Sequence, residues 1–309
     1  MLPAYITHPD CLKHQMGDQH PEAPERIGAI HDMLLMKGML DFMQCWEAPL
    51  ATEQQLAQAH DLAYIRELAA RVPMQGTVRI DPDTSMNHYS YTAALRAAGA
   101  AVLAVNLVLE GRAASAFCNV RPPGHHAERA AAGGFCFFNN AAIAVRHALN
   151  VHHLQRVALL DFDVHHGNGS EDILHHEPRA LMCSIFEDQL YPFCGNQPRG
   201  PNMINVALPS RSGGDTMRAA VEEAWLPALE RFRPQLIVVS AGFDGHRDDD
   251  MGNLGLVEAD YAWLTHRIMD VARRHAHGRV VSCLEGGYDL SALARSAAAH
   301  LRVLLGLDD

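Results

Sequence analysis

The sequence has 309 residues, of which 48% are apolar and 20% are charged. This composition excludes a disordered chain, and the length can support one large domain or two ordinary ones. The formal net charge of −11 argues against nucleic acid or an anionic membrane surface as the main partner. The 20 histidines point to metal binding or acid–base chemistry. The seven cysteines never form a C-x-x-C pair, so we expect no disulfide scaffold.

The predicted elements alternate between helix and strand along most of the chain. Apolar runs of strand length, apolar on both faces, are typical of parallel strands covered by helices on each side. No internal repeat or linker interrupts the pattern, so we expect a single α/β domain over residues 1–309 with a mainly parallel sheet. Helical patterns occupy 24–37, 61–71, 88–110, 138–149, 214–232, 258–276 and 288–305, and the strand-like runs occupy 114–119, 156–162, 180–185, 236–240 and 279–284.

The most apolar long stretch, residues 92–110, contains Arg96 and Asn106. We therefore expect a core helix there and not a membrane span. The first residues lack the basic segment and apolar segment of a signal peptide, so we expect no such peptide and a cytoplasmic protein.

Unusual polar residues follow four of the predicted strands directly. The segments are RPPGHHA (121–127), DFDVHHGNG (161–169), SAGFDGHRDDD (240–250) and LEGGYD (284–289). In α/β sheets, ligands bind outside the carboxyl ends of parallel strands. The four segments therefore predict an active site at one edge of the sheet.

Asp163 and His165 are two residues apart and would project together from an extended strand, with Asp161 behind them. Asp244, at the end of another strand, supplies a third ligand. Two carboxylates and an imidazole with an open position suit a catalytic divalent metal, most simply zinc, with iron(II) as the alternative. The alternative is that these residues form a polar strand end that contacts solvent and binds no metal.

The remaining candidates also follow strands. His125 and His126 come after a turn stiffened by two prolines, and Tyr288 follows two glycines that leave room for a ligand. A phenol there can donate to an oxyanion, although an isolated tyrosine more often packs against a helix start. The charged run 247–250 is expected to be a solvated loop.

In this order, RPPGHHA, GFCFFNN (134–140), DFDVHHGNG, AGFDGHRDDDMG (241–252) and LEGGYD resemble the metal-dependent deacetylase superfamily. This superfamily includes the histone deacetylases, the bacterial histone-deacetylase-like amidohydrolases and the acetylpolyamine amidohydrolases. With HPEAPERI (20–27), the resemblance covers residues 5–305. It implies the arginase–deacetylase fold, a single domain around an eight-stranded parallel sheet with helices on both faces. It also implies zinc-dependent removal of acetyl or other small acyl groups from acyl-lysine or from acylated amines and polyamines, and leaves a homo-oligomer open.

The resemblance also implies a role for each site residue. It makes Asp163, His165 and Asp244 the zinc ligands. His126 becomes the general base and acid, with His125 as its electrostatic partner. It further implies that Asp161 orients His125, that Asn168 orients His126 and that Tyr288 stabilises the oxyanion. The remaining implied features are a substrate tunnel of Asp83, Gly134, Phe135, Tyr191 and Met251, Arg26 at an internal acetate cavity, and a structural potassium ion on main-chain oxygens of Asp161, Asp163 and His165 together with Ser184.

Two residues depart from the family pattern. Phe186 stands where the family often has histidine, which predicts a different tunnel mouth, and Met251 is not the glutamate of some polyamine-selective relatives. Two alternatives stay open. An arginase-like ureohydrolase would need two metals and more bridging carboxylates, and a catalytically inactive acyl-lysine binder would need the same tunnel without turnover.

Overall fold

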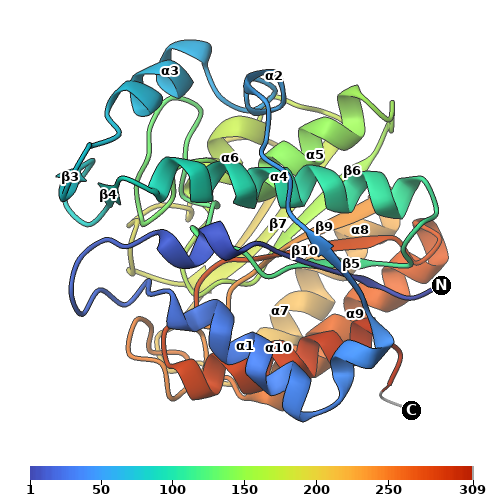
Figure 1. Ribbon diagram of the computed structural model, residues 1–309. Coiled ribbons are helices and arrows are strands. Elements are labelled where there is room, and N and C mark those ends of the chain that lie inside the picture. The colour runs from blue at the N-terminus through green and yellow to red at the C-terminus, as the bar shows by residue number, and fades with distance from the viewer. Residues whose placement is uncertain (308–309) are drawn as a thin grey trace.

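The computed structural model describes residues 1–307 and contains an eight-stranded parallel sheet with helices on both faces (Figure 1). Every pair of neighbouring strands is parallel, in the order β2-β1-β5-β10-β9-β6-β7-β8. The predicted α/β fold is therefore confirmed. The strands are β1 (Ala4–Thr7), β2 (Gln44–Glu47), β5 (Ala116–Cys118), β6 (Val157–Asp161), β7 (Ala180–Glu187), β8 (Met203–Leu208), β9 (Leu236–Ala241) and β10 (Val280–Leu284).

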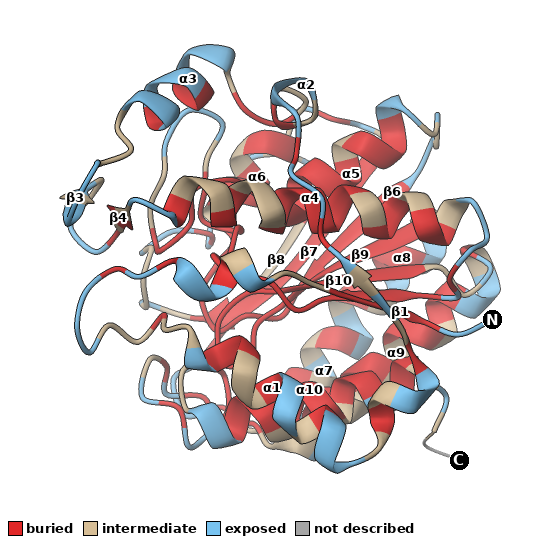
Figure 2. Cartoon of the chain, in the orientation of Figure 1, coloured by how far each residue is buried: buried red, intermediate tan, exposed pale blue. Residues whose placement is uncertain are grey.

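Two groups of helices cover the sheet. Helices α4 (Ser90–Leu109) and α5 (Asn140–Asn150) pack together over one face, while α1 (Glu25–Met36), α9 (Glu258–His275) and α10 (Leu290–Leu304) cover the other. Figure 2 shows the sheet buried between them. The smaller elements are η1 (Pro9–Lys13), η2 (Met39–Phe42), α2 (Glu53–Leu56), α3 (Leu62–Ala70), α6 (Asn168–Leu174) and the antiparallel pair β3 (Thr77–Arg79) and β4 (Ser85–Asn87).

The central strands form where the sequence predicts them because they are apolar on both faces. Every residue of β6, β7, β9 and β10 is buried. Three outer strands, β1, β2 and β8, were not predicted from the pattern. β1 and β2 are short, with only four residues each. β2 and β8 are partly exposed, so these two strands do not form continuous apolar runs.

Helix α4 confirms the expected core helix. Among residues 1–307 it is the one helix long and apolar enough to cross a membrane, yet 67% of its most apolar window is buried inside the fold. Gly99 on this helix lies so close to the Pro49 carbonyl that a Cβ atom would overlap it. The close approach explains why a glycine is tolerated within a long helix.

The predicted helix over 214–232 is interrupted by one π-helical turn. The segment comprises α7 (Gly214–Ala220), the turn Val221–Trp225 and α8 (Leu226–Phe232). Pro227 has no N–H to donate to the carbonyl four residues earlier, and the turn lies where this bond is missing.

Candidate active site

The four strands that precede the polar segments are neighbours in the centre of the sheet, in the order β5-β10-β9-β6. Because all four run parallel, the loops that follow them meet at one edge. The convergence predicted from the sequence is therefore present in the structure.

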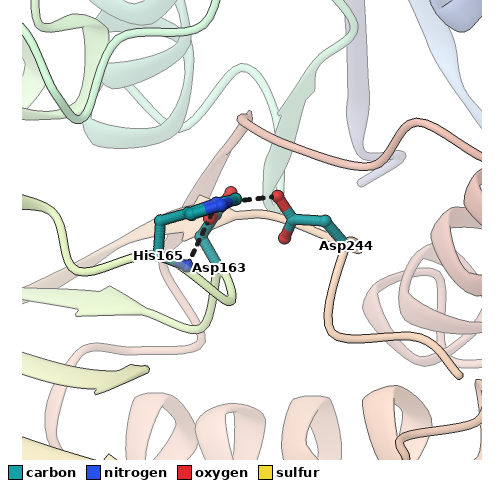
Figure 3. Close-up of side chains that lie close together, drawn as sticks. All are labelled: Asp163, His165 and Asp244. Atoms are coloured by element: carbon teal, nitrogen blue, oxygen red, sulfur yellow. Dashed lines mark hydrogen bonds and ion pairs between the residues drawn. The ribbon is translucent and has the colours of Figure 1, made fainter. Parts of the chain in front are cut away.

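The candidate metal ligands Asp163, His165 and Asp244 lie together where β6 and β9 end (Figure 3). All three are buried, and one donor atom from each lies within 4.8 Å of the others. His165 Nδ1 is 3.0 Å from Asp163 Oδ1 and 3.2 Å from Asp244 Oδ2. The expected extended strand through these residues is wrong, because β6 ends at Asp161 and the chain then turns. Carboxylates hold the turn: the Asp163 N–H donates to Asp161 Oδ1, and the His165 N–H donates to Asp163 Oδ1.

This donor set fits a divalent metal ion. Two carboxylates and one imidazole leave a further position open, as catalytic metal sites do. Asp244 Oδ2 is buried, and among residues 1–307 no donor is aligned well enough to hydrogen-bond it. Burial and the charge of Asp163 raise the pKa of Asp244 to about 6, so these crowded carboxylates would be stabilised by a bound cation. Gly242 and Gly286 make room for the carboxylates, since a Cβ at either would overlap one of them.

His125 and His126 stand beside this cluster with their ring centroids 4.0 Å apart. His125 Nδ1 lies 3.0 Å from Asp161 Oδ2, and His126 Nδ1 lies 2.8 Å from Asn168 Oδ1. The structure thus brings together the two pairs that the resemblance implies. One imidazole faces a carboxylate and the other a neutral amide.

The two histidines differ in basicity as a result. Burial disfavours the charged form of His125, but the charges of Asp163 and Asp161 outweigh it and raise its pKa well above the ordinary value. Burial, with the nearby charges of His125 and His165, holds the pKa of His126 well below the ordinary value. His125 therefore keeps a proton, while His126 is neutral and free to accept one.

A cavity of about 130 Å³ reaches His126, His165 and Tyr288. The centroid of the tyrosine ring lies 5.9 Å from that of Phe135, which also lines the cavity. Burial raises the pKa of Tyr288 well above the ordinary value, so the phenol remains a donor. The other walls are Asp83, Gly134, Phe135, Tyr191 and Met251, which are the five residues expected to contact substrate.

Sequence reasoning missed Asp249, which lies in a run expected to be solvated. That expectation is wrong for this residue, whose exposed fraction is 5%. Its Oδ2 accepts the N–H of Tyr288 at 2.6 Å and the N–H of Asp289 at 3.0 Å, and its Oδ1 accepts the N–H of Met251 at 3.1 Å. Asp289 in turn caps α10 by accepting the Ala292 N–H. Asp249 therefore ties the loop that carries Tyr288 to the loop that carries Asp244.

Glu285 was also missed, although it lies within the LEGGYD segment. Its carboxylate is fully buried and accepts the N–H groups of Gly124 and His125 at 2.6 and 3.0 Å, and the hydroxyl of Ser240 at 3.0 Å. Burial raises the pKa of Glu285 to about 7. The glutamate fixes the turn that presents the histidine pair.

Arg26 lies behind Tyr288, with its guanidinium carbon 4.9 Å from the centre of the tyrosine ring. Its Nε donates to the Gly287 carbonyl at 2.6 Å, and it forms an ion pair with the buried Glu22. Glu22 also pairs with the buried Arg121. These contacts hold the Tyr288 loop from the side away from the cavity, while an acetate cavity at Arg26 stays a prediction.

Phe186 does not line the cavity. It is buried, and its ring lies 4.8 Å from the ring of His166, so the expectation that it changes the tunnel mouth is wrong. Ser184, the expected potassium ligand, pairs with Asp161 in the register of β6 and β7. The expected potassium residues are thus neighbours, and the ion stays a prediction.

The parallel α/β sheet carries a buried Asp–His–Asp cluster beside paired histidines, an arrangement that suits metal-assisted hydrolysis. The model of the histone deacetylase domain matches residues 20–304. The chain is 36% identical to the histone deacetylase-like amidohydrolase of Pseudomonas aeruginosa, over 93% of this chain and 77% of that protein. It is 33% identical to a probable deacetylase of Archaeoglobus fulgidus, over 100% of this chain and 88% of that protein. The crystal structure of the HDA15 HD domain superimposes with a TM-score of 0.92 at 30% identity, covering 99% of this chain and 88% of the other. The chain belongs to the histone deacetylase family.

Proposed function

We propose that the chain is a zinc-dependent deacylase that removes acetyl or another small acyl group from acyl-lysine or a small acylated amine. The observation that carries this proposal is the cavity of about 130 Å³, in which His165 of the Asp–His–Asp cluster lies with His126 and Tyr288 in the lining. Asp163, His165 and Asp244 would hold the ion. When bound there, a zinc ion would polarise the amide carbonyl and lower the pKa of a bound water molecule.

His126 would act as the general base and then as the general acid. Its Nδ1 is engaged by Asn168, which leaves Nε2 to take a proton from the attacking water. The same nitrogen would then protonate the departing amine. His125 is held protonated by Asp161, so it would supply positive charge without exchanging its proton.

Tyr288 would donate its hydroxyl hydrogen bond to the oxyanion that forms during attack. Its phenol stays protonated because burial raises its pKa, and its loop is fixed by Asp249 and Arg26. The catalytic donor would therefore be oriented before substrate arrives.

The cavity favours a slender acylated alkylamine. Phe135 and Tyr191 supply aromatic walls for an alkyl chain, and Met251 adds a flexible apolar surface. Asp83, also in the lining, would accept a hydrogen bond from the substrate's N–H groups or pair with a cationic amine. We further propose a structural potassium ion on main-chain oxygens of Asp161, Asp163 and His165 together with Ser184, and a cytoplasmic location.

The test is a panel of acylated lysine peptides and acylated polyamines assayed with the zinc-loaded protein. The proposal predicts turnover of at least one member of the panel, and Tyr288→Phe should lower kcat on the order of 10²–10³-fold. Tyr89→Phe is the matched control, because Tyr89 is exposed and lies outside the cavity. Absence of turnover across the whole panel would refute the proposed function, and full activity of Tyr288→Phe would refute the oxyanion role.

The arginase-like alternative receives no support from the ligand set. Among residues 1–307, Asp163, His165 and Asp244 are the one cluster found with metal-ligand spacing. His166 is followed by Gly167 and Asn168. Asn168 carries an amide, whereas a two-metal site would need a further carboxylate. Metal analysis that finds two tightly bound ions per chain would reverse this conclusion.

A further inference from the structure

His126 is the end of a three-membered chain of hydrogen bonds that begins at Glu128. The Asn168 Nδ2 donates to Glu128 Oε1 at 2.9 Å, and Asn168 Oδ1 lies 2.8 Å from His126 Nδ1. A carboxylate, an amide and an imidazole are thus linked in series. Glu128 lies only two residues after His126 in the sequence, but its carboxylate reaches the histidine through Asn168.

The chemistry of these groups fixes the direction of the chain. An ionised carboxylate can only accept, so the NH₂ group of Asn168 must face Glu128. The amide oxygen then faces His126, and since that oxygen can only accept, the proton of the neutral imidazole must sit on Nδ1. Nε2 is left with a lone pair. Without Glu128 the amide could rotate by half a turn, present NH₂ to Nδ1 and move the imidazole proton to Nε2.

We propose that Glu128 is a positioning residue that selects the tautomer of His126 able to act as a base, by fixing the amide orientation of Asn168. This inference rests on the proposed function, because only a reaction that uses His126 as a base requires that tautomer. The amide between them also keeps a full negative charge away from His126, in contrast to His125, which contacts Asp161 directly.

The Glu128 end of the chain is anchored through its backbone. The Glu128 N–H donates to the Ala131 carbonyl at 2.9 Å, and His60 Nδ1 donates to the Glu128 carbonyl at 2.9 Å. The other nitrogen of this buried histidine, Nε2, accepts the Asn139 N–H at 2.9 Å. Both nitrogens of His60 are therefore engaged, and this histidine links the main chain at Glu128 to the main chain at Asn139.

The Asn168 end is anchored by helix α6, which Asn168 begins. A Cβ atom at Gly169 would overlap the Ala127 carbonyl, so the first turn of the helix lies directly against the chain that carries His126. The Ser170 N–H also donates to the His125 carbonyl at 3.1 Å. These contacts hold the backbone of Asn168 close to His126. The orientation of the Asn168 side-chain amide then depends on its hydrogen bond to Glu128.

The test compares Glu128→Ala in two backgrounds, using the full-length protein. In the native background, loss of this outer partner should lower kcat by about 10–100-fold while KM changes by less than about threefold. In the Asn168→Asp background there is no amide orientation left to select, and the new carboxylate would lie against Glu128, so adding Glu128→Ala should not lower kcat. Glu128→Gln, whose amide can donate as well as accept, no longer dictates the orientation of the Asn168 amide and should recover kcat only in part. Glu222→Ala, at an exposed glutamate outside the cavity, is the matched control.

A readout independent of turnover is the ¹⁵N NMR spectrum of the His126 ring, assigned with a His126→Gln variant. Wild type should show Nδ1–H, and Glu128→Ala should show a substantial share of Nε2–H. An unchanged tautomer in Glu128→Ala, or an equal loss of kcat in both backgrounds, would each overturn the proposal. A Glu128→Gln variant with the kcat of wild type would show that an acceptor-only partner is not required, and would also overturn it. If the wild-type protein hydrolyses no acylated amine, the proposed function fails, while the NMR measurement still decides the role of Glu128.

Discussion

Replacing Asp249 by alanine should separate folding from catalysis, because this carboxylate holds the loop of Tyr288. The substitution removes the acceptor of three backbone donors, on Tyr288, Asp289 and Met251. A hydrogen bond to a charged group contributes about 1.5–3 kcal/mol, and water can reach part of this loop, so we expect a loss of about 3 kcal/mol in unfolding free energy. A displacement of the phenol on the order of 1 Å should lower kcat about 10²-fold.

The assay is steady-state kinetics on the best substrate of the acylated panel, alongside chemical denaturation. KM should change less than kcat, because Asp249 holds Met251 but neither of the aromatic walls, Phe135 and Tyr191. Asp250→Ala is the control, since this neighbouring aspartate in the same loop is exposed. A kcat for Asp249→Ala within about twofold of wild type would show that Tyr288 is positioned without this carboxylate.

Two further predictions concern Gly134 in the cavity lining and the pH dependence of stability. Gly134→Ala should abolish most turnover, because Gly134 has a φ of 54° and a Cβ atom there would overlap the His126 ring; a wild-type kcat would contradict this. His60 is buried, and burial lowers its pKa from 6.5 to about 4. The unfolded chain therefore binds more protons in this range, so stability is complete above pH 6.5 and falls as the pH drops towards 4, by on the order of 3 kcal/mol. Chemical denaturation of wild type and His60→Gln across this pH range should show a shallower pH dependence of unfolding free energy in the variant. Identical curves would show that His60 does not contribute to this dependence.

The sequence predicted the centre of the fold better than its edges. β6 and β9 are continuous apolar runs, and burial on both faces leaves this pattern in the sequence. β2 has four residues that alternate between half-buried and exposed, so its place at the edge of the sheet depends on pairing with β1 and leaves little local signal.

The candidate site was predictable to the extent that its residues follow strands. Asp163, His165 and Asp244 were found because strand ends converge, although the local geometry is a turn and not the expected extended strand. Asp249 was not predictable, because its carboxylate is buried by N–H donors that lie 39 and 40 residues further along the chain. Burial of a charge by distant backbone donors leaves no pattern in the neighbouring sequence.

The central claim is that an ion held by Asp163, His165 and Asp244 supports hydrolysis of an acylated amine. The most direct measurement is hydrolysis of an acetyl-lysine peptide and an acetylated polyamine by metal-free protein titrated with zinc, with bound metal determined in parallel. We predict that activity rises with zinc and reaches its maximum at about one catalytic ion per chain, and that Asp244→Asn loses both the ion and the activity. Activity that is independent of added metal, or that needs a second ion, would contradict the account.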